Sequence, residues 1–292
     1  MRHLNVIAGL LLASCLLHGS CSNGNAGEGP KSVAGRASAS RDGSQRESRS
    51  TVLPRALECL VQAYPAFVTR AEGGVKLADG RVLHAADTTV LPDVAAMSRV
   101  EYEKMLERGS LMLQLQTGVL YDTTYLGTRR NWDPGRLRNE ALFAMMYGAS
   151  AAQVRAKLTT ITWMPGVFDH RVQITSVNDV HKKLEAVSRE LAALPKRFHA
   201  YCGPIGGTFN YRAVRGSTRR SAHAYGIAID LNTKYSDYWL WKGGKTGEVR
   251  YANRLPLEIV RVFEKHGFIW GGRWYHYDTM HFEYRPEMLC TQ

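Results

Sequence analysis

Apolar side chains recur at helical spacing in two segments of the chain. Between Val177 and Leu194 they lie three or four positions apart, and Pro195 follows directly. The run from Leu257 to His266 lies between a proline and a glycine, residues that favour the beginning and the end of a helix, respectively. An apolar stripe of this period predicts two helices that each pack one face against a core.

Shorter patterns between residues 52 and 195 predict a mixture of helices and strands. The expected elements are helices over Leu53–Tyr64 and Arg138–Tyr147, a hairpin over Val75–Leu83 and a strand over Leu111–Leu115. Two later strands are expected where two kinds of side chain alternate along the chain. Large apolar residues alternate with small or acidic ones at Gly226–Leu231, and polar residues alternate with aromatic ones at His281–Tyr284. The chain is therefore predicted to be an α+β protein with a small, mainly antiparallel sheet, flanking helices and an N-terminal accessory α/β region.

The chain begins like an exported protein. A basic start at residues 1–3 leads into an apolar run that ends near Leu17, which is typical of a secretory signal and too short for a membrane span. Residues 11–15 resemble a bacterial lipobox, in which Cys15 would receive a lipid. The alternatives are lipid modification of Cys21 and simple signal-peptidase cleavage near residue 19 or 20 without a lipid. We expect a periplasmic or cell-surface protein, attached to the membrane through an N-terminal lipid if either cysteine is modified.

Four regions are expected along the chain. Residues 1–20 form the signal, and residues 21–51 are a tether whose Ser, Gly, Ala and Arg cannot bury enough surface to offset chain entropy. Residues 52–195 are predicted to form the accessory region, and residues 196–292 the domain that carries the candidate chemistry. The sequence contains no internal repeat and no apolar run after residue 20 that is typical of a membrane span, and no obligate protein partner is expected.

The formal net charge of the chain is +12, which favours anionic polymers as partners. Export argues against nucleic acid as that polymer, and the sequence contains no nucleic-acid recognition motif. Other polymers that carry carboxylates and lipid headgroups remain as candidates.

Three cysteines lie beyond the signal, Cys59, Cys202 and Cys290. An odd number of cysteines in an oxidising compartment predicts one disulfide with one free thiol, or no disulfide. A bond between Cys202 and Cys290 would fasten the C-terminus to the domain of residues 196–292. Pairing of Cys59 with either of the other two stays open.

The segment from Ser221 to Asp230 contains the first candidate metal ligands. His223 and Asp230 are seven residues apart, so in one straight strand they would lie on opposite faces. Gly226 is well placed to make the turn that brings them together. Ala228 lies on the same strand face as Asp230, and its small side chain leaves room for a metal.

The second candidate segment runs from Asp278 to Glu283. His281 and Glu283 share one strand face, so His281 can reach the metal while Glu283 orients a ligand. Asp278 comes three residues before His281 and can take a proton from a metal-bound water as general base. Two imidazoles and one carboxylate leave a fourth position for water, which is typical of catalytic zinc rather than structural zinc.

The motifs S-x-H-x-x-G-x-A-x-D, W-G-G-x-W and D-x-x-H-F-E, read from Ser221 to Glu283, resemble the M15 family of zinc peptidases, which cut peptidoglycan stem peptides. The resemblance covers about the last third of the chain and implies a mononuclear Zn²⁺ site. It assigns His223, Asp230 and His281 as zinc ligands, Asp278 as catalytic base, and Arg212 with Ser221 as the groups that hold a substrate carbonyl or carboxylate. Trp274 is a further candidate for the wall of the cleft.

The resemblance implies hydrolysis of peptidoglycan stem peptides. Family members that resemble L-alanyl-D-glutamate endopeptidases usually carry Asp at the base position, as this chain does at Asp278, so an endopeptidase is expected. The alternatives are a D-alanyl-D-alanine carboxypeptidase with the same zinc machinery, and an inactive protein that only binds the wall. A structural zinc with Glu283 or His276 as a fourth ligand is a further alternative.

Overall fold

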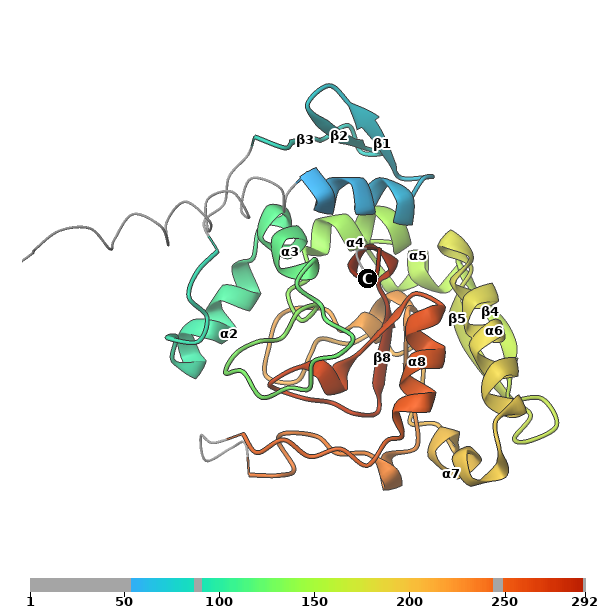
Figure 1. Cartoon of the computed structure of the whole chain (residues 1–292). Helices are drawn as coiled ribbons and strands as arrows, with labels where there is room; N and C mark the ends of the chain where they lie inside the picture. The colour runs from blue at the N-terminus through green and yellow to red at the C-terminus, as the bar shows by residue number, and fades with distance from the viewer. Residues whose placement is uncertain (1–53, 87–90, 244–248, 291–292) are drawn as a thin grey trace, which may run out of the picture. The chain divides into compact units, whose positions relative to one another are not determined.

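The structure of the protein is a computed structural model, and it describes residues 54–86, 91–243 and 249–290 (Figure 1). Its C-terminal half contains a three-stranded antiparallel sheet in the order β6-β8-β7. The strands are β6 (Ala228–Asp230), β7 (Phe268–Trp270) and β8 (His281–Tyr284). β8 is therefore the central strand, although it is the last in the sequence. The predicted α+β class with small antiparallel sheets is confirmed.

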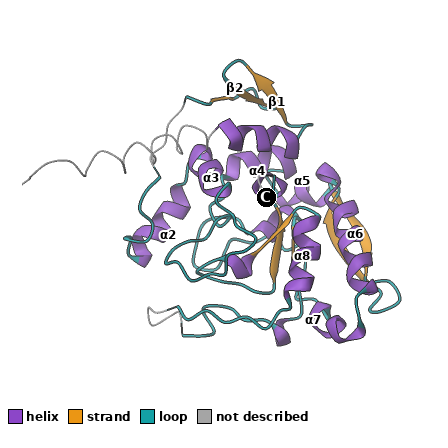
Figure 2. Ribbon diagram, in the orientation of Figure 1, coloured by secondary structure: helices purple, strands orange, loops and turns teal. Residues whose placement is uncertain are grey.

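Helices and two smaller sheets complete the described part of the chain (Figure 2). The helices are α2 (Arg99–Arg108), α3 (Leu111–Gly118), α4 (Glu140–Tyr147), α5 (Ala151–Arg155), α6 (Val180–Ala193), α7 (His199–Cys202) and α8 (Leu257–Lys265), and residues 54–63 are also helical. The other strands are β1 (Val68–Ala71), β2 (Gly74–Leu77), β3 (Val82–His84), β4 (Leu158–Trp163) and β5 (His170–Thr175). The predicted helices at α4, α6 and α8 and the predicted hairpin of β2 and β3 are confirmed.

One hydrophobic core is shared by elements from before and after residue 195. It contains Leu60 of the first helical segment, Leu184 of α6, Phe263 of α8 and Phe282 of β8. The Phe263 and Phe282 rings stack with centroids 3.8 Å apart, so α8 is fastened directly to the central strand. The described residues accordingly all belong to one compact unit.

The prediction of a strand over Leu111–Leu115 is wrong, because this segment begins helix α3. Ser110 caps the helix by accepting a hydrogen bond from the backbone N–H of Leu113, at 3.1 Å. The alternating pattern was misleading because α3 is buried on more than one side, with Gln114 and Gln116 buried beside the leucines. A helix without a polar face does not show the 3.6-residue period on which the distinction from a strand depends.

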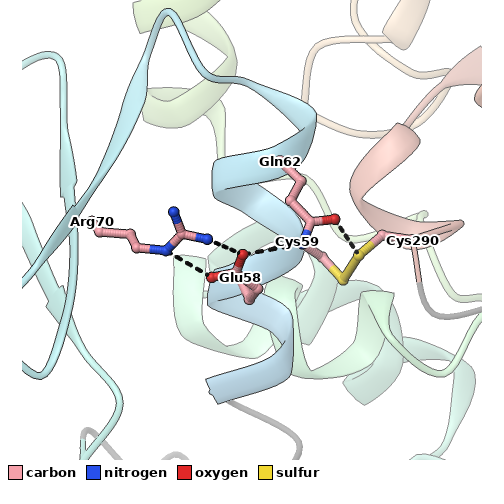
Figure 3. Close-up of a disulfide and its surroundings, with 5 residues drawn as sticks. All are labelled: Glu58, Cys59, Gln62, Arg70 and Cys290. Carbon is pink, nitrogen blue, oxygen red and sulfur yellow. Dashed lines mark hydrogen bonds and ion pairs between the residues drawn. A yellow bond between two sulfur atoms is a disulfide. The ribbon is translucent and has the colours of Figure 1, made fainter.

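Of the pairings that the sequence left open, the structure forms the one between Cys59 and Cys290 and not that between Cys202 and Cys290 (Figure 3). Cys202 lies in α7, where it is a buried free thiol inside the core. The disulfide joins the first helical segment to the C-terminal end of the described chain, across 231 residues of sequence. The sequence could not reveal this pairing, because the two ends meet only through the tertiary fold.

No helix among residues 54–86, 91–243 and 249–290 is long and apolar enough to cross a membrane. The predicted signal, the lipobox at Cys15, the alternative at Cys21 and the tether lie outside the described residues.

Candidate metal centre and active site

Three elements bring the candidate metal ligands together. His223 lies in the 3₁₀ turn Ala222–Tyr225, Asp230 ends β6, and His281 begins β8. The turn ends at Gly226, whose left-handed backbone conformation (φ 66°, ψ 32°) reverses the chain between the first two ligands. The expected turn at Gly226 is therefore present. Residues Asp230 and His281 are direct partners in the antiparallel pairing of β6 with β8.

The facing atoms of these three side chains form a small triangle. His223 Nε2 lies 3.2 Å from His281 Nδ1 and 3.2 Å from Asp230 Oδ1, and His281 Nδ1 lies 3.0 Å from Asp230 Oδ1. Two ligand atoms of a tetrahedral zinc ion with bonds of ~2.0–2.1 Å are about 3.3 Å apart. The spacing of the triangle therefore fits one metal ion bound by His223, Asp230 and His281.

The outer nitrogen of each imidazole has a partner of its own. His223 Nδ1 contacts the backbone carbonyl oxygen of Thr208, and His281 Nε2 lies 3.2 Å from Glu283 Oε2. Glu283 is fully buried and is held in turn by Arg138 at 3.0 Å and Arg285 at 3.1 Å. Such outer contacts fix the ring orientation and leave the inner nitrogen free for a metal. Glu283 thus lies where it can orient His281, as expected from the sequence.

Charge in the site favours a cation. Burial acts to raise the pKa of Asp230, but His223 and His281 hold that pKa well below its usual range, so the carboxylate is ionised. For His281, burial acts to lower the pKa, whereas hydrogen bonds and charges from Asp230 and Glu283 raise it to about 10. In the metal-free protein a proton on His281 thus occupies the position that a metal ion would take.

Asp278 lies next to this triangle and lines the same cavity. Its Oδ1 atom is buried and has no hydrogen-bond partner among the described residues. Burial and then the negative charge of Asp230 raise the pKa of Asp278 to about 7. A carboxylate with a pKa near neutrality can both accept and release a proton during a reaction, which is the property required of a general base.

The cavity beside the triangle has a volume of about 370 Å³. Its lining brings together the sequence-predicted residues Arg212, Ser221 and Trp274 with the candidate ligands and Asp278. Ser221 is buried and caps the turn of His223, whereas Arg212 is exposed and donates to the carbonyl oxygen of Ala213. The Trp274 indole is fixed by a 2.6 Å hydrogen bond to Pro134, so this ring forms a rigid part of the wall.

Sequence reasoning pointed to Arg212 and its neighbours Arg215 and Arg219, but it missed Arg136 and Arg138 in the lining of this cavity. Besides Arg212, the wall contains Arg136, Arg138, Arg215 and Arg219. Burial and then the charges of Arg136 and Arg138 lower the pKa of Arg219 to about 10, while the nearby carboxylates of Glu103 and Glu107 act to raise it. A signal was present in the short spacing of Arg136 and Arg138, but nothing in the sequence joined them to the distant metal ligands.

Residues 215–284 match a family model described as D-alanyl-D-alanine carboxypeptidase, one of the M15 peptidases. This region of the chain is similar to the M15 peptidases, and the match supports an M15-family peptidase. The match contains the candidate ligands, Asp278, Ser221 and Trp274, whereas Arg212 lies before it. Neither the curated proteins nor the solved structures include a match to the chain. The M15 peptidase family acts on peptidoglycan, so a peptidase that acts on this polymer is supported.

Proposed function

We propose that this M15 peptidase is a zinc enzyme that hydrolyses the stem peptides of peptidoglycan. The observation that carries the proposal is the triangle of His223, Asp230 and His281 with the half-buried side chain of Asp278 beside it, whose Oδ1 has no hydrogen-bond partner among the described residues. A protein that only binds the wall would have no need for a carboxylate with a raised pKa at this place. A structural zinc would need a fourth protein ligand, and the cluster among the described residues contains three.

Each group in the cavity has a proposed task. When bound, zinc supplies a Lewis acid that activates water and polarises a peptide carbonyl group. Asp278 takes the proton of the attacking water and delivers it to the leaving amine. Ser221 and Arg212 hold a carbonyl or carboxylate oxygen of the substrate, and Trp274 limits where the peptide can lie.

The arginines favour a substrate with a free carboxylate close to the cleaved bond. Guanidinium groups bind carboxylates with two parallel hydrogen bonds, and this geometry gives orientation as well as affinity. D-Glutamate carries a second carboxyl group, so cleavage between L-alanine and D-glutamate would place such a charge near the arginines. Asp278 at the base position also favours this endopeptidase, as the resemblance to such enzymes implies.

A D-alanyl-D-alanine carboxypeptidase is the second candidate. The family model that matches residues 215–284 carries this description, and a terminal D-alanine would also bring a free carboxylate to the arginines. The two candidates differ only in which bond lies over the metal, so the products of the reaction separate them.

The proposed site of action is outside the cytoplasmic membrane, with attachment through an N-terminal lipid. The Cys59–Cys290 disulfide supports this proposal, because such bonds form and persist mainly in oxidising compartments. Peptidoglycan is present in the same location.

The test is mass spectrometry of purified muropeptides after incubation with the zinc-loaded protein, with and without a zinc chelator. Release of L-alanine-terminated fragments that the chelator prevents would support the endopeptidase, and loss of one D-alanine would support the carboxypeptidase. Asp278→Asn is expected to keep stoichiometric zinc and lose roughly 10²–10⁴-fold in rate, the usual contribution of a general base. His223→Ala should lose both zinc and activity. A fully metal-loaded protein that leaves every stem peptide intact would refute the proposal.

A further inference from the structure

An exposed aromatic ring forms part of the wall of the cavity. Trp241 lines the cavity that contains the metal triangle, yet 58% of this residue is exposed. Every other Phe, Trp and Tyr among the described residues is buried or half-buried. The Trp241 indole is therefore open to solvent and also within reach of a molecule that occupies the cavity.

The segment before Trp241 is paired with the segment that contains Asp278. Backbone hydrogen bonds of 2.9 and 3.0 Å join residues 237–239 to residues 277–279 and make Tyr238 and Asp278 direct antiparallel partners. These bonds lie on either side of the pair, and facing residues of this kind have Cα atoms about 4.5 Å apart and side chains on one face. Burial and then the negative charge of Asp278 raise the pKa of Tyr238. Tyr238 thus lies beside the proposed general base.

Tyr238 in turn holds Trp241. The backbone N–H of Trp241 donates to the carbonyl oxygen of Tyr238 at 2.8 Å, which closes a turn between the two residues. Their ring centroids are 5.6 Å apart and the ring planes are at 84°, an edge-to-face arrangement that leaves at least one face of the indole uncovered by Tyr238. The wall of the cavity therefore continues from Asp278 through Tyr238 to an aromatic ring that is accessible to solvent.

A sugar ring is the partner that such a surface fits. The face of an aromatic ring carries partial negative charge, and a pyranose presents C–H groups of slight positive charge on one face. The hydroxyl groups of the sugar stay solvated when only that face is covered, which suits an exposed indole. In peptidoglycan the L-alanine of each stem peptide is attached to a sugar of the glycan strand. In the proposed endopeptidase reaction, a sugar is thus one residue away from the cleaved bond.

We propose that Trp241 binds the glycan strand of peptidoglycan by stacking on a sugar ring, so that the enzyme recognises the sugar together with its stem peptide. This inference rests on the proposed peptidase function and deepens it, because it names a part of the substrate outside the peptide. The competing explanations are that the indole contacts the stem peptide itself or a lipid surface.

The experiment uses two substrates that differ only in the sugars, the disaccharide tetrapeptide of peptidoglycan and the same tetrapeptide without the disaccharide. The zinc-loaded full chain is compared with Trp241→Ala, Trp241→Phe and Trp241→Leu, of which phenylalanine keeps a ring face and leucine keeps only apolar surface. Val100→Ala is the control for loss of an exposed apolar side chain, because Val100 is 64% exposed and does not line the cavity. The measurements are kcat/KM on each substrate and, in the slow Asp278→Asn background, the Kd of each substrate.

Trp241→Ala should lower the ratio of kcat/KM with the sugars to kcat/KM without them by about 5–30-fold, the loss typical of an aromatic contact truncated to alanine. The Kd of the disaccharide tetrapeptide should rise by a similar factor relative to that of the free tetrapeptide. Trp241→Phe should keep this ratio within about threefold of the wild type, and Trp241→Leu should resemble Trp241→Ala, because stacking requires a ring face. Val100→Ala should give the wild-type ratio.

Equal losses on the two substrates in Trp241→Ala would overturn the inference, since the indole would then act on the peptide or on the fold of its own turn. A wild-type ratio in Trp241→Ala, together with loss of binding to phosphatidylglycerol vesicles, would overturn it in favour of a lipid surface. If the zinc-loaded wild type cleaves neither substrate, the proposed function fails, but the comparison of Kd values still decides whether Trp241 binds the sugar.

Discussion

Asp230 and His281 face each other as direct partners across β6 and β8, with Asp230 Oδ1 3.0 Å from His281 Nδ1. Two of the three candidate metal ligands are therefore held by strand pairing rather than by a loop. β8 is also paired with β7 on its other edge, and α8 packs on it through Phe263. The separation of these two ligands is consequently set by the rigid part of the fold, and their orientation by the groups behind them.

Replacement of Glu283 by glutamine is expected to weaken zinc binding. The Glu283 carboxylate orients the His281 ring from behind and adds negative charge to the site. Loss of such an outer contact typically costs about 10–100-fold in metal affinity. The zinc Kd of Glu283→Gln should rise by about this factor in competition with a chromophoric chelator.

The control for this prediction is Glu190→Gln, which removes a carboxylate from His266 outside the cavity. Both variants need a measured melting temperature, because Glu283 also pairs with Arg138 and Arg285 in the interior. An unchanged zinc Kd in a folded Glu283→Gln protein would contradict the role given to this carboxylate.

Zinc binding should release a proton and weaken as the pH falls. The pKa of His281 is raised to about 10 in the metal-free protein, so below that pH a proton competes with the metal for this residue. Between about pH 8 and 9, where Asp278 with its pKa of about 7 is mostly ionised, each unit of falling pH should weaken the apparent affinity by about tenfold. Titration calorimetry in buffers of different ionisation enthalpy measures the released proton directly. Binding that does not vary with pH in this window would show that His281 is not protonated.

The candidate metal ligands could be identified from the sequence because their signals are local. His223, Gly226 and Asp230 lie within one short segment, where the odd spacing required a turn and Gly226 could make it. Alternation in the strand that begins at His281 likewise placed Glu283 on the face of the ligand. The catalytic and substrate-binding roles of the lining residues stay predictions, although the structure brings these residues to one cavity.

The remainder of the site depends on contacts that no local pattern encodes. Asp133 and Arg138 both lie in the loop before α4, yet one holds His276 and the other holds Glu283. Their partners are 143 and 145 positions away in the sequence. The same reason explains why the sequence left the cysteine pairing open, since the Cys59–Cys290 contact arises only in the tertiary fold.

Removal of the disulfide should destabilise the protein while leaving the metal site intact. The bond closes a loop across 231 residues, and native disulfides typically contribute about 2–4 kcal/mol to the free energy of unfolding. A reductant should lower the urea concentration at the midpoint of unfolding for the wild type and for Cys202→Ala, which keeps the disulfide. The reductant should not change this midpoint for a protein that carries both Cys59→Ser and Cys290→Ser. A wild-type midpoint that is insensitive to complete reduction would contradict the prediction.

Replacement of Gly226 by alanine tests whether the turn between two ligands controls the metal site. The Gly226 backbone has φ 66°, and a Cβ atom there would lie 2.7 Å from Cδ2 of Leu158 in β4 and 3.3 Å from the backbone nitrogen of Thr175. Gly166 is a matched control, because its φ is 76° but no atom lies within 4 Å of the corresponding Cβ position. Both alanines incur the left-handed backbone cost of about 1–2 kcal/mol. Only Gly226→Ala adds a steric conflict, typically about 1–3 kcal/mol.

The two variants should therefore differ in stability and in zinc affinity. Gly226→Ala should unfold at a lower urea concentration than Gly166→Ala, because Leu158 or the turn must move. A shift of the turn changes the position of His223 relative to Asp230, so the zinc Kd should rise for Gly226→Ala and stay at the wild-type value for Gly166→Ala. If both variants lose the same stability and both keep wild-type zinc affinity, the close packing of Gly226 against β4 has no part in positioning the ligands. A loss of zinc affinity confined to Gly226→Ala would show that this contact sets the ligand geometry, beyond any general loss of stability.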